Sequence, residues 1–323
     1  MAGPAIRAWE MARALAASQP VVLASTAAVE LDAPDFTVAP FSPGLLAAAS
    51  VVVLSGDVVT PYPQVLDVDV PVVVDCYDPA HLELLEQARD AGPERRRLMV
   101  AHAVAATSRQ LARADLVLCA SPRQRDLWLG HLAALGRVSP ALYDEDPSLG
   151  SLVALVPFGL AAEPPVATVP GPREVVDGIG PDDPLLLWAG GLYNWFDPAL
   201  VVRAVDRLRA SHPDVRLLFL GGGHPNPAVP AMSAATAAAA LVAELGLSRH
   251  VFFAEGWVPY AERASWLLQA DLGVCAAVDS VENAFSYRTR LLDHLWTGLP
   301  TVTTGGDALS ELLADAGAGL AVA

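Results

Sequence analysis

Two arginines, a hydroxyl group and a carboxylate gather at one predicted strand-to-helix turn in the C-terminal half of the chain. Ser286, Arg288 and Arg290 lie at the start of a predicted helix over residues 288–297, and Glu282 lies just upstream. Helix N-termini attract anions, and arginine adds a planar fork that can bind a phosphate through two hydrogen bonds. In a chain of net charge −16 this turn predicts a diphosphate pocket. The alternative is a solvated charged face at an ordinary helix start.

Three further features of the same half suit a nucleotide ligand. Asp293 lies on the same predicted helix, where its carboxylate could accept hydrogen bonds from ribose hydroxyls. Gly191 ends a predicted strand, and a glycine there lets the phosphates of a ligand approach the backbone. Trp257 follows another predicted strand, whose end could offer backbone groups to a nucleobase, although a core tryptophan under a turn is an equal alternative. The glycine turn at 221–223 lacks the GxGxxG spacing, so no dinucleotide site is predicted.

The N-terminal half offers fewer chemical groups. Asp75 and Asp78 end a predicted strand and are candidate general bases, although Asp78 could instead cap the helix that follows. His102, on a predicted helix, is interpreted as an ordinary surface or core histidine. Three scattered cysteines lack zinc-site spacing and are expected to be small buried residues in a reducing compartment. The sequence therefore predicts no metal site.

The composition narrows the class of protein. Of 323 residues, 53% are hydrophobic and 17% are charged, which excludes a disordered chain. The sequence has no lysine, so the 20 residues counted as Lys or Arg are all arginine. The sequence pI of about 4.7 argues against binding to nucleic acid or anionic lipid. No apolar run reaches the roughly 18 residues that a transmembrane helix needs. No signal peptide is evident, so we expect a cytoplasmic protein.

The elements that must position these groups alternate between short strands and helices. Such an alternation predicts parallel sheets with helices on both faces. The predicted strands cover residues 20–25, 35–40, 51–55, 71–75, 116–120, 152–157, 185–189, 215–220, 251–254, 272–276, 300–303 and 319–323.

A Pro- and Gly-rich stretch interrupts the alternation in the middle of the chain. We therefore expect a first domain over residues 1–164, a linker over 165–183 and a second domain over 184–323. The predicted fold is α/β, with two tandem doubly wound, Rossmann-like domains. Ligands of such folds bind at the carboxyl ends of strands, and the cleft between the domains is the expected site.

The order of the motifs is informative beyond their separate chemistry. It runs VPFG (156–159), LWAGG (187–191), FLGGG (219–223), GWVP (256–259) and RLLDHLWTGLPTV (290–302). This order resembles that of the GT-B glycosyltransferases, in particular the large group-one (family four) class, which uses nucleotide-sugar donors. The resemblance covers nearly the whole chain and is most specific in the second domain.

The resemblance implies roles for individual residues. Asp293 would hold the ribose, and Arg290 and Arg288 would face the diphosphate beside Gly191. Val258 and its neighbours, Trp257 among them, would meet the base. Glu282 would contact the donor sugar, and Gly3 would line the cleft from a glycine-rich loop in the first domain.

The chain also departs from the family pattern. The family commonly places two glutamates eight positions apart, whereas here the second is Asp293 and Glu282 lies eleven residues before it. Many relatives carry Arg and Lys where residues 192–195 of this chain read LYNW. Two alternatives follow from the second departure: Arg288 and Arg290 supply the missing positive charge, or the backbone holds most of the diphosphate.

The resemblance implies a metal-independent glycosyltransferase without a cofactor. It would move a sugar from a nucleoside diphosphate sugar to an acceptor that the sequence does not identify, with Asp78 and Glu282 as candidate catalytic residues. Two alternatives stay open at this stage. One is a non-catalytic GT-B-like protein that binds a nucleotide or scaffolds a partner, and the other is a sugar-nucleotide epimerase of the same fold.

Overall fold

The computed structural model describes residues 3–27, 31–221 and 232–322. The chain divides into two compact units. Unit 1 comprises Met1–His81 and Pro93–Phe158, and unit 2 comprises Leu82–Gly92 and Gly159–Ala323. The hydrogen bonds from Asn194 Nδ2 to the Gln87 carbonyl and from Trp296 Nε1 to the Glu163 carbonyl explain why residues 82–92 and 159–164 group with unit 2.

Unit 1 is built on two parallel sheets. One pairs β1 (Val22–Ser25) with β2 (Thr37–Pro40), and the other has the order β3-β4-β5-β6. The strands of the larger sheet are β3 (Val52–Ser55), β4 (Val72–Asp75), β5 (Leu116–Cys119) and β6 (Val153–Leu155). The helices are α1 (Gly3–Ala16), α2 (Pro43–Ala48), α3 (Ala80–Gln87, mostly in unit 2), α4 (Pro93–Arg113), α5 (Pro122–Ala134) and α6 (Pro140–Glu145).

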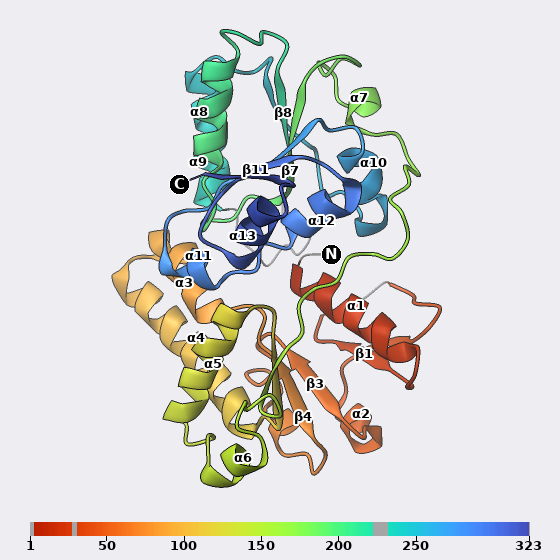
Figure 1. Ribbon diagram of the computed structural model, residues 1–323, viewed down its shortest axis with the longest axis vertical. Helices are drawn as coiled ribbons and strands as arrows, with labels where there is room; N and C mark the ends of the chain where they lie inside the picture. The colour runs from red at the N-terminus through yellow and green to blue at the C-terminus, as the bar shows by residue number, and fades with distance from the viewer. Residues whose placement is uncertain (1–2, 28–30, 222–231, 323) are drawn as a thin grey trace. The chain divides into compact units, whose positions relative to one another are not determined.

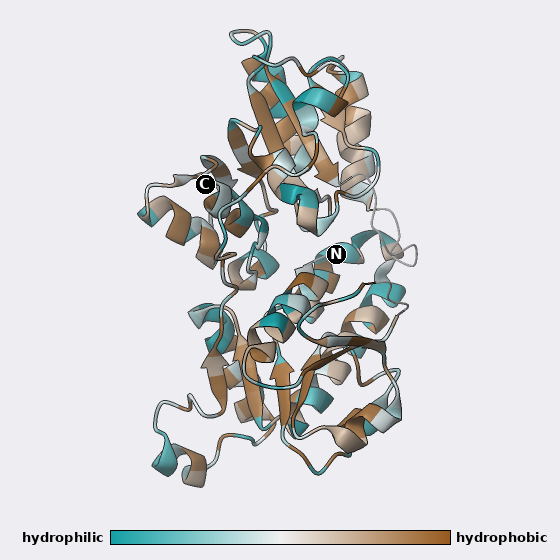
Figure 2. Cartoon of the chain, turned by 90° about the vertical axis from the view of Figure 1, so that its right-hand side faces the viewer, coloured by the Kyte–Doolittle hydropathy of each residue, from teal (hydrophilic) through white to brown (hydrophobic). Residues whose placement is uncertain are grey.

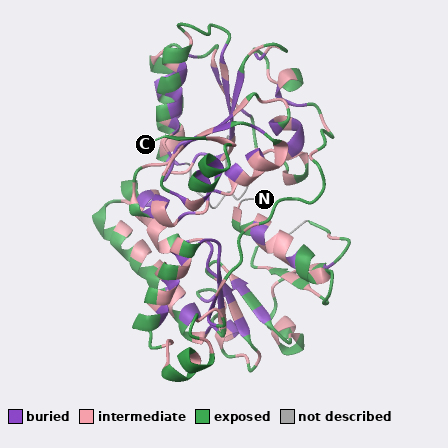
Figure 3. Cartoon of the chain, viewed as in Figure 1, coloured by how far each residue is buried: buried purple, intermediate pink, exposed green. Residues whose placement is uncertain are grey.

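The core of unit 1 follows from its apolar strands. Val72 and Val74 of β4 and Val117 of β5 are buried against Leu111 and Trp128 of the covering helices. In Figures 2 and 3 these strands are accordingly hydrophobic and buried. The sequence predicted each strand of this unit, but not that the described strands would form two separate sheets.

Unit 2 holds one six-stranded parallel sheet in the order β12-β11-β10-β7-β8-β9. Figure 1 labels three of its strands, β7, β8 and β11. The strands are β7 (Leu185–Gly191), β8 (Arg216–Gly221), β9 (Val251–Phe253), β10 (Leu272–Cys275), β11 (Thr301–Thr304) and β12 (Gly319–Val322). The helices are α7 (Pro172–Val175), α8 (Pro198–Leu208), α9 (Ser233–Glu244), α10 (Arg263–Leu267), α11 (Val281–Phe285), α12 (Arg290–Thr297) and α13 (Ala308–Asp315). Strand order reverses between β7 and β10, where doubly wound folds bind ligands at the carboxyl ends.

Alternating side chains of β7 explain the layers of unit 2. Leu186 and Trp188 pack into a cluster with residues of α8, α9 and α13, whereas Leu185 and Leu187 pack with Leu267 of α10 on the other face. Both faces are apolar, as expected of a parallel strand covered by helices on both sides. The doubly wound α/β class predicted from the sequence is thereby confirmed.

Local sequence signals fix the ends of the helices near the site. Asp197 accepts a hydrogen bond from the Leu200 amide, and Pro198 occupies the first turn of α8. Gly298 ends α12 in the left-handed region, with φ +67°. The short helices α6 and α11 were not predicted.

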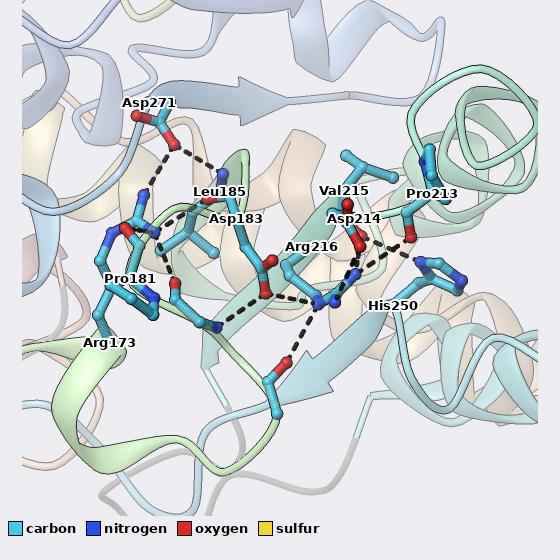
Figure 4. Close-up of polar contacts among 12 residues, drawn as sticks. Arg173, Pro181, Asp183, Leu185, Pro213, Asp214, Val215, Arg216, His250 and Asp271 are labelled. Atoms are coloured by element: carbon cyan, nitrogen blue, oxygen red, sulfur yellow. Dashed lines mark hydrogen bonds and ion pairs between the residues drawn. The ribbon is translucent and has the colours of Figure 1, made fainter.

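Residues 165–183, predicted as a linker, pack against unit 2 through Arg173 (Figure 4). The Arg173 guanidinium donates to the carbonyls of Gly180, Pro181 and Asp183 and forms an ion pair with Asp271. Asp271 also accepts the amide of Leu185, so the segment is tied to the start of β7. In the part of the chain that the structure describes, no helix is both long enough and apolar enough to cross a membrane.

Candidate functional site

The candidate site is built around the carboxyl end of β7 in unit 2, beside the point where strand order reverses. Gly190 has φ +120°, which favours glycine. A side chain at Gly221, the last residue of β8, would collide with the backbone of Gly190 and Gly191. Gly221 therefore lets β8 approach β7 closely, whereas the ring of Tyr193 fills the space that a Cβ would take at Gly191. The approach of a ligand's phosphates to Gly191 stays a prediction.

Arg290, the first residue of α12, reaches this strand end. Its Nη2 donates to the Gly191 carbonyl at 2.9 Å, and its guanidinium carbon lies 4.0 Å from the ring centre of Phe196 and 4.8 Å from that of Trp188. Its Nη1 is buried and has no hydrogen-bond partner among the described residues. Burial lowers the pKa of Arg290, but a guanidinium remains charged at neutral pH. A buried charged donor without an acceptor suits an anionic ligand.

Arg288 is engaged elsewhere, although the sequence grouped it with Arg290. Its Nη2 donates to Glu282 Oε2 at 2.6 Å and to Asn283 Oδ1 at 3.2 Å. Both members of this ion pair are buried, and Glu282 is fully inaccessible. The pairing arises because Ser280 caps α11 and starts a turn that carries Glu282 back toward Arg288. The structure thus pairs Glu282, which was predicted to contact the donor sugar, with Arg288, which was predicted to contact the diphosphate.

Asp293 lies one turn further along α12 and is held by Arg263. The Nε of Arg263 donates to Asp293 Oδ1 at 2.9 Å, and its guanidinium stacks on the rings of Tyr260 (3.7 Å) and Trp296 (4.5 Å). Burial raises the pKa of Asp293, and the charge and hydrogen bond of Arg263 oppose that rise. Among the described residues, the other oxygen, Oδ2, has no hydrogen bond, so it can accept one from a ligand.

The sequence reasoning missed Arg263. It lies on a predicted helix 30 positions before Asp293, and neither its type nor its spacing links it to that carboxylate. The stacking of Tyr260 three residues earlier is a local signal, but it does not show which face of the helix meets α12.

Trp257 and Val258 lie close to the end of β8. Trp257 forms an isolated antiparallel bridge with Gly221, and Val258 packs against the apolar cluster that includes Leu220 and Ala254. Their backbone is therefore placed beside the strand end, where the sequence predicted contacts to a base. The other glycines of that turn, 222 and 223, lie outside the described residues.

The remaining predicted residues occupy other surroundings. Ser286 donates its hydroxyl to the Asn283 carbonyl at 3.0 Å, within the turn that ends α11. Gly3 is the first residue of helix α1, rather than part of a loop. Asp78 follows β4 in unit 1, where its carbonyl accepts the amide of Ala80. Asp75 forms a buried ion pair with Arg7.

The structure therefore gathers Gly191, Arg290, Asp293, Trp257 and Val258 on unit 2 around the ends of β7 and β8 or on α12. Gly3 and Asp78 belong to unit 1. Among the residues that the structure describes, no group of three or more His, Cys, Asp or Glu side chains could hold a metal ion.

Comparisons with known proteins concern the fold of the chain and the family of unit 2. Residues 183–323 match the family model described as glycosyl transferases group 1. A search of curated proteins gave no match. Among solved structures, the chain resembles WaaG, a glycosyltransferase involved in lipopolysaccharide biosynthesis, with a TM-score of 0.60 and 18% identity over 98% of this chain and 81% of WaaG.

Two further structures share the fold. An α,α-trehalose 6-phosphate synthase from Burkholderia multivorans has a TM-score of 0.57 and 10% identity, over 86% of this chain and 61% of that protein. HepE from Anabaena, solved in complex with UDP and glucose, has a TM-score of 0.55 and 13% identity, over 86% of this chain and 69% of HepE. The family match covers the sheet and the site of unit 2, so residues 183–323 form a group 1 glycosyl transferase domain, in a chain that shares its fold with the GT-B glycosyltransferase WaaG.

Proposed function

We propose that this protein is a glycosyltransferase that takes its sugar from a nucleoside diphosphate sugar, and that unit 2 binds the nucleotide. The observation that carries the proposal is the buried Nη1 of Arg290, a charged donor without a partner among the described residues at the carboxyl end of β7. An anion that accepts this donor would remove the cost of leaving it unsatisfied. The likeness to HepE, which was solved with UDP and glucose, supports the same class of donor.

The neighbouring residues suggest how the rest of the donor is held. The diphosphate would lie beside Gly190 of β7, where an added Cβ would lie 3.7 Å from Arg290 Nη2, and Asp293 Oδ2 would accept a hydrogen bond from a ribose hydroxyl. The backbone around Trp257 and Val258 would meet the base. Glu282 has no part in this proposal, because it is inaccessible and paired with Arg288.

Arg290 would also act on the reaction itself. When the bond between the anomeric carbon and the phosphate oxygen breaks, negative charge grows on the leaving diphosphate. A guanidinium held against two aromatic rings stabilises that charge without having to reorganise. We propose that this cation, together with backbone N–H groups, does so without a metal ion, and that the acceptor, whose hydroxyl takes the sugar, binds on unit 1. Asp78 of unit 1 stays a prediction for the catalytic base.

A thermal-shift panel of UDP, GDP, dTDP and ADP tests the proposal. A ligand at 100 times its Kd should stabilise the protein by about 2.7 kcal/mol, so one nucleotide should raise the melting temperature clearly. Arg290→Met should weaken its binding by about 1.5–3 kcal/mol, because a hydrogen bond to a charged group is lost. The control is Arg203→Met at an exposed position of α8. No shift with any nucleotide, or full affinity in Arg290→Met, would contradict the proposal.

Metal independence has its own measurement. Sugar release from the donor selected by the panel should persist in excess EDTA at the rate seen without it. A rate that falls in EDTA and returns with Mg²⁺ or Mn²⁺ would show that a metal ion supplies part of the charge.

A further inference from the structure

The segment that follows β7 carries aromatic residues beside the predicted phosphate position and no basic residue between Gly191 and Phe196. Tyr193 stacks on Trp195, with ring centres 4.7 Å apart and an interplanar angle of 13°. Trp195 is itself buried and contacts Phe196, the ring on which Arg290 lies. The ring of Tyr193 is therefore held in one place by stacking, which a phenylalanine would provide equally well.

The hydroxyl of Tyr193 lies against the backbone of the site. A Cβ at Gly191 would lie 2.7 Å from two carbons of the Tyr193 ring and 2.9 Å from its hydroxyl oxygen. Gly191 is the residue whose carbonyl accepts Arg290 Nη2. Burial raises the pKa of Tyr193, so the phenol keeps its proton at neutral pH and can donate a hydrogen bond.

The positive charge at the site is small, so a further hydrogen-bond donor such as the Tyr193 hydroxyl would help to bind a diphosphate. Glu282 compensates the charge of Arg288, whereas no ion pair involving Arg290 occurs within the described residues. A nucleoside diphosphate carries more than one negative charge, so Arg290 alone does not match it. We propose that the hydroxyl of Tyr193 donates a hydrogen bond to a phosphate oxygen of the donor beside Arg290. This inference rests on the proposed function and assigns a second phosphate ligand within it.

The test compares Tyr193→Phe, which removes one oxygen and keeps the stacked ring, with Tyr143→Phe at an exposed position of α6. The ligands are the nucleoside diphosphate that stabilises the wild type most and the corresponding nucleoside without phosphate. Affinities come from isothermal titration for the diphosphate and ligand-observed NMR for the nucleoside. Tyr193→Phe should bind the diphosphate about tenfold more weakly, because a hydrogen bond to a charged group is lost, and the nucleoside equally well. Tyr143→Phe should match the wild type with both ligands.

Two outcomes would overturn the inference alone. One is an unchanged affinity of Tyr193→Phe for the diphosphate while Arg290→Met weakens it. The other is an equal loss for the diphosphate and the nucleoside, which would mean that the hydroxyl acts through the shape of the pocket and not on phosphate. If the wild type binds none of the four nucleoside diphosphates, the proposed function fails as well.

Discussion

Arg7 of unit 1 and Arg290 of unit 2 both reach the last residue of a central parallel strand, and both lie on two aromatic rings. Arg7 donates to both carboxylate oxygens of Asp75, at 2.7 and 2.8 Å, and to the Val156 carbonyl. Its guanidinium lies 4.8 Å from the ring centre of Phe158 and 5.3 Å from that of Tyr77. Arg290 has the same kind of aromatic contacts but one carbonyl partner and a buried nitrogen left over.

The difference separates an arginine that holds the fold from one that is ready for a ligand. In the buried pair of Arg7 and Asp75 the arginine compensates the carboxylate and donates to both of its oxygens, and breaking the pair leaves an uncompensated charge in the interior. The guanidinium of Arg290 is buried although its Nη1 has no acceptor among the described residues, which is unfavourable. A ligand can supply that acceptor. The residue type alone does not distinguish the two cases, because both are arginines near a strand end.

The largest effect on stability should follow from breaking the ion pair between Arg7 and Asp75. Arg7→Met leaves the buried carboxylate of Asp75 without its partner, so the free energy of unfolding should fall by about 3–5 kcal/mol. Urea denaturation followed by fluorescence and circular dichroism measures this. Arg290→Met strands no carboxylate, so its free energy of unfolding should fall by clearly less.

Two variants sharpen the result. Arg13→Met breaks the exposed pair with Glu10 on the same helix and should cost less than about 1 kcal/mol. The double variant Arg7→Met, Asp75→Leu removes both charges and should recover most of the lost stability. If Arg7→Met is as mild as Arg13→Met, or if the double variant is no more stable than the single one, the contrast between the two arginines does not hold.

The fold could be predicted from the sequence because its signals are local. Apolar runs such as 185–189 indicate buried strands, and Asp197 followed by Pro198 marks a helix start without knowledge of the rest of the chain. Short elements with weaker periodicity, such as α11, escape this reasoning. Arg173 shows a further limit: its bond to Asp271 spans 98 positions, so a Pro- and Gly-rich stretch is predicted as a linker although it is packed.

The candidate site was predicted less completely, for the same physical reason. Arg290, Asp293 and Gly191 lie on elements whose ends the sequence indicates, and the structure places them around the ends of β7 and α12. Which carboxylate pairs with which arginine depends on side-chain directions that residue spacing does not encode. The sequence therefore did not predict that Glu282 takes Arg288 away from the site or that Arg263 holds Asp293.

Replacing Arg263 should have an intermediate effect, which appears in the pH dependence of nucleotide affinity. Burial raises the pKa of Asp293 and Arg263 opposes that rise, so Arg263→Gln should raise the pKa further. The ionised carboxylate is the form that best accepts a ribose hydroxyl, so affinity falls as pH drops through this pKa. In Arg263→Gln the fall should begin about one pH unit higher, a change that approaches about 1.4 kcal/mol at a pH below both pKa values. Titrations of the selected nucleoside diphosphate from pH 4.5 to 8 measure this.

Inorganic pyrophosphate and a second variant are the controls for Arg263. Pyrophosphate has no ribose, so its binding should have the same pH dependence in Arg263→Gln and the wild type. Arg203→Gln changes the net charge equally at an exposed position and should leave both profiles unchanged. A nucleotide profile that does not move in Arg263→Gln would mean that Asp293 does not meet the ribose in its ionised form.

The smallest effect is expected at Ser286, a residue that the sequence grouped with the phosphate ligands. Its hydroxyl donates to the Asn283 carbonyl inside the turn that ends α11, so it is satisfied within the fold, as Arg7 is. Ser286→Ala should therefore lower the free energy of unfolding by about 0.5–1.5 kcal/mol and leave nucleotide affinity unchanged. Denaturation and titration on the same preparation separate the two readouts. A loss of affinity at unchanged stability would instead place Ser286 with Arg290, among the groups whose partner is the ligand.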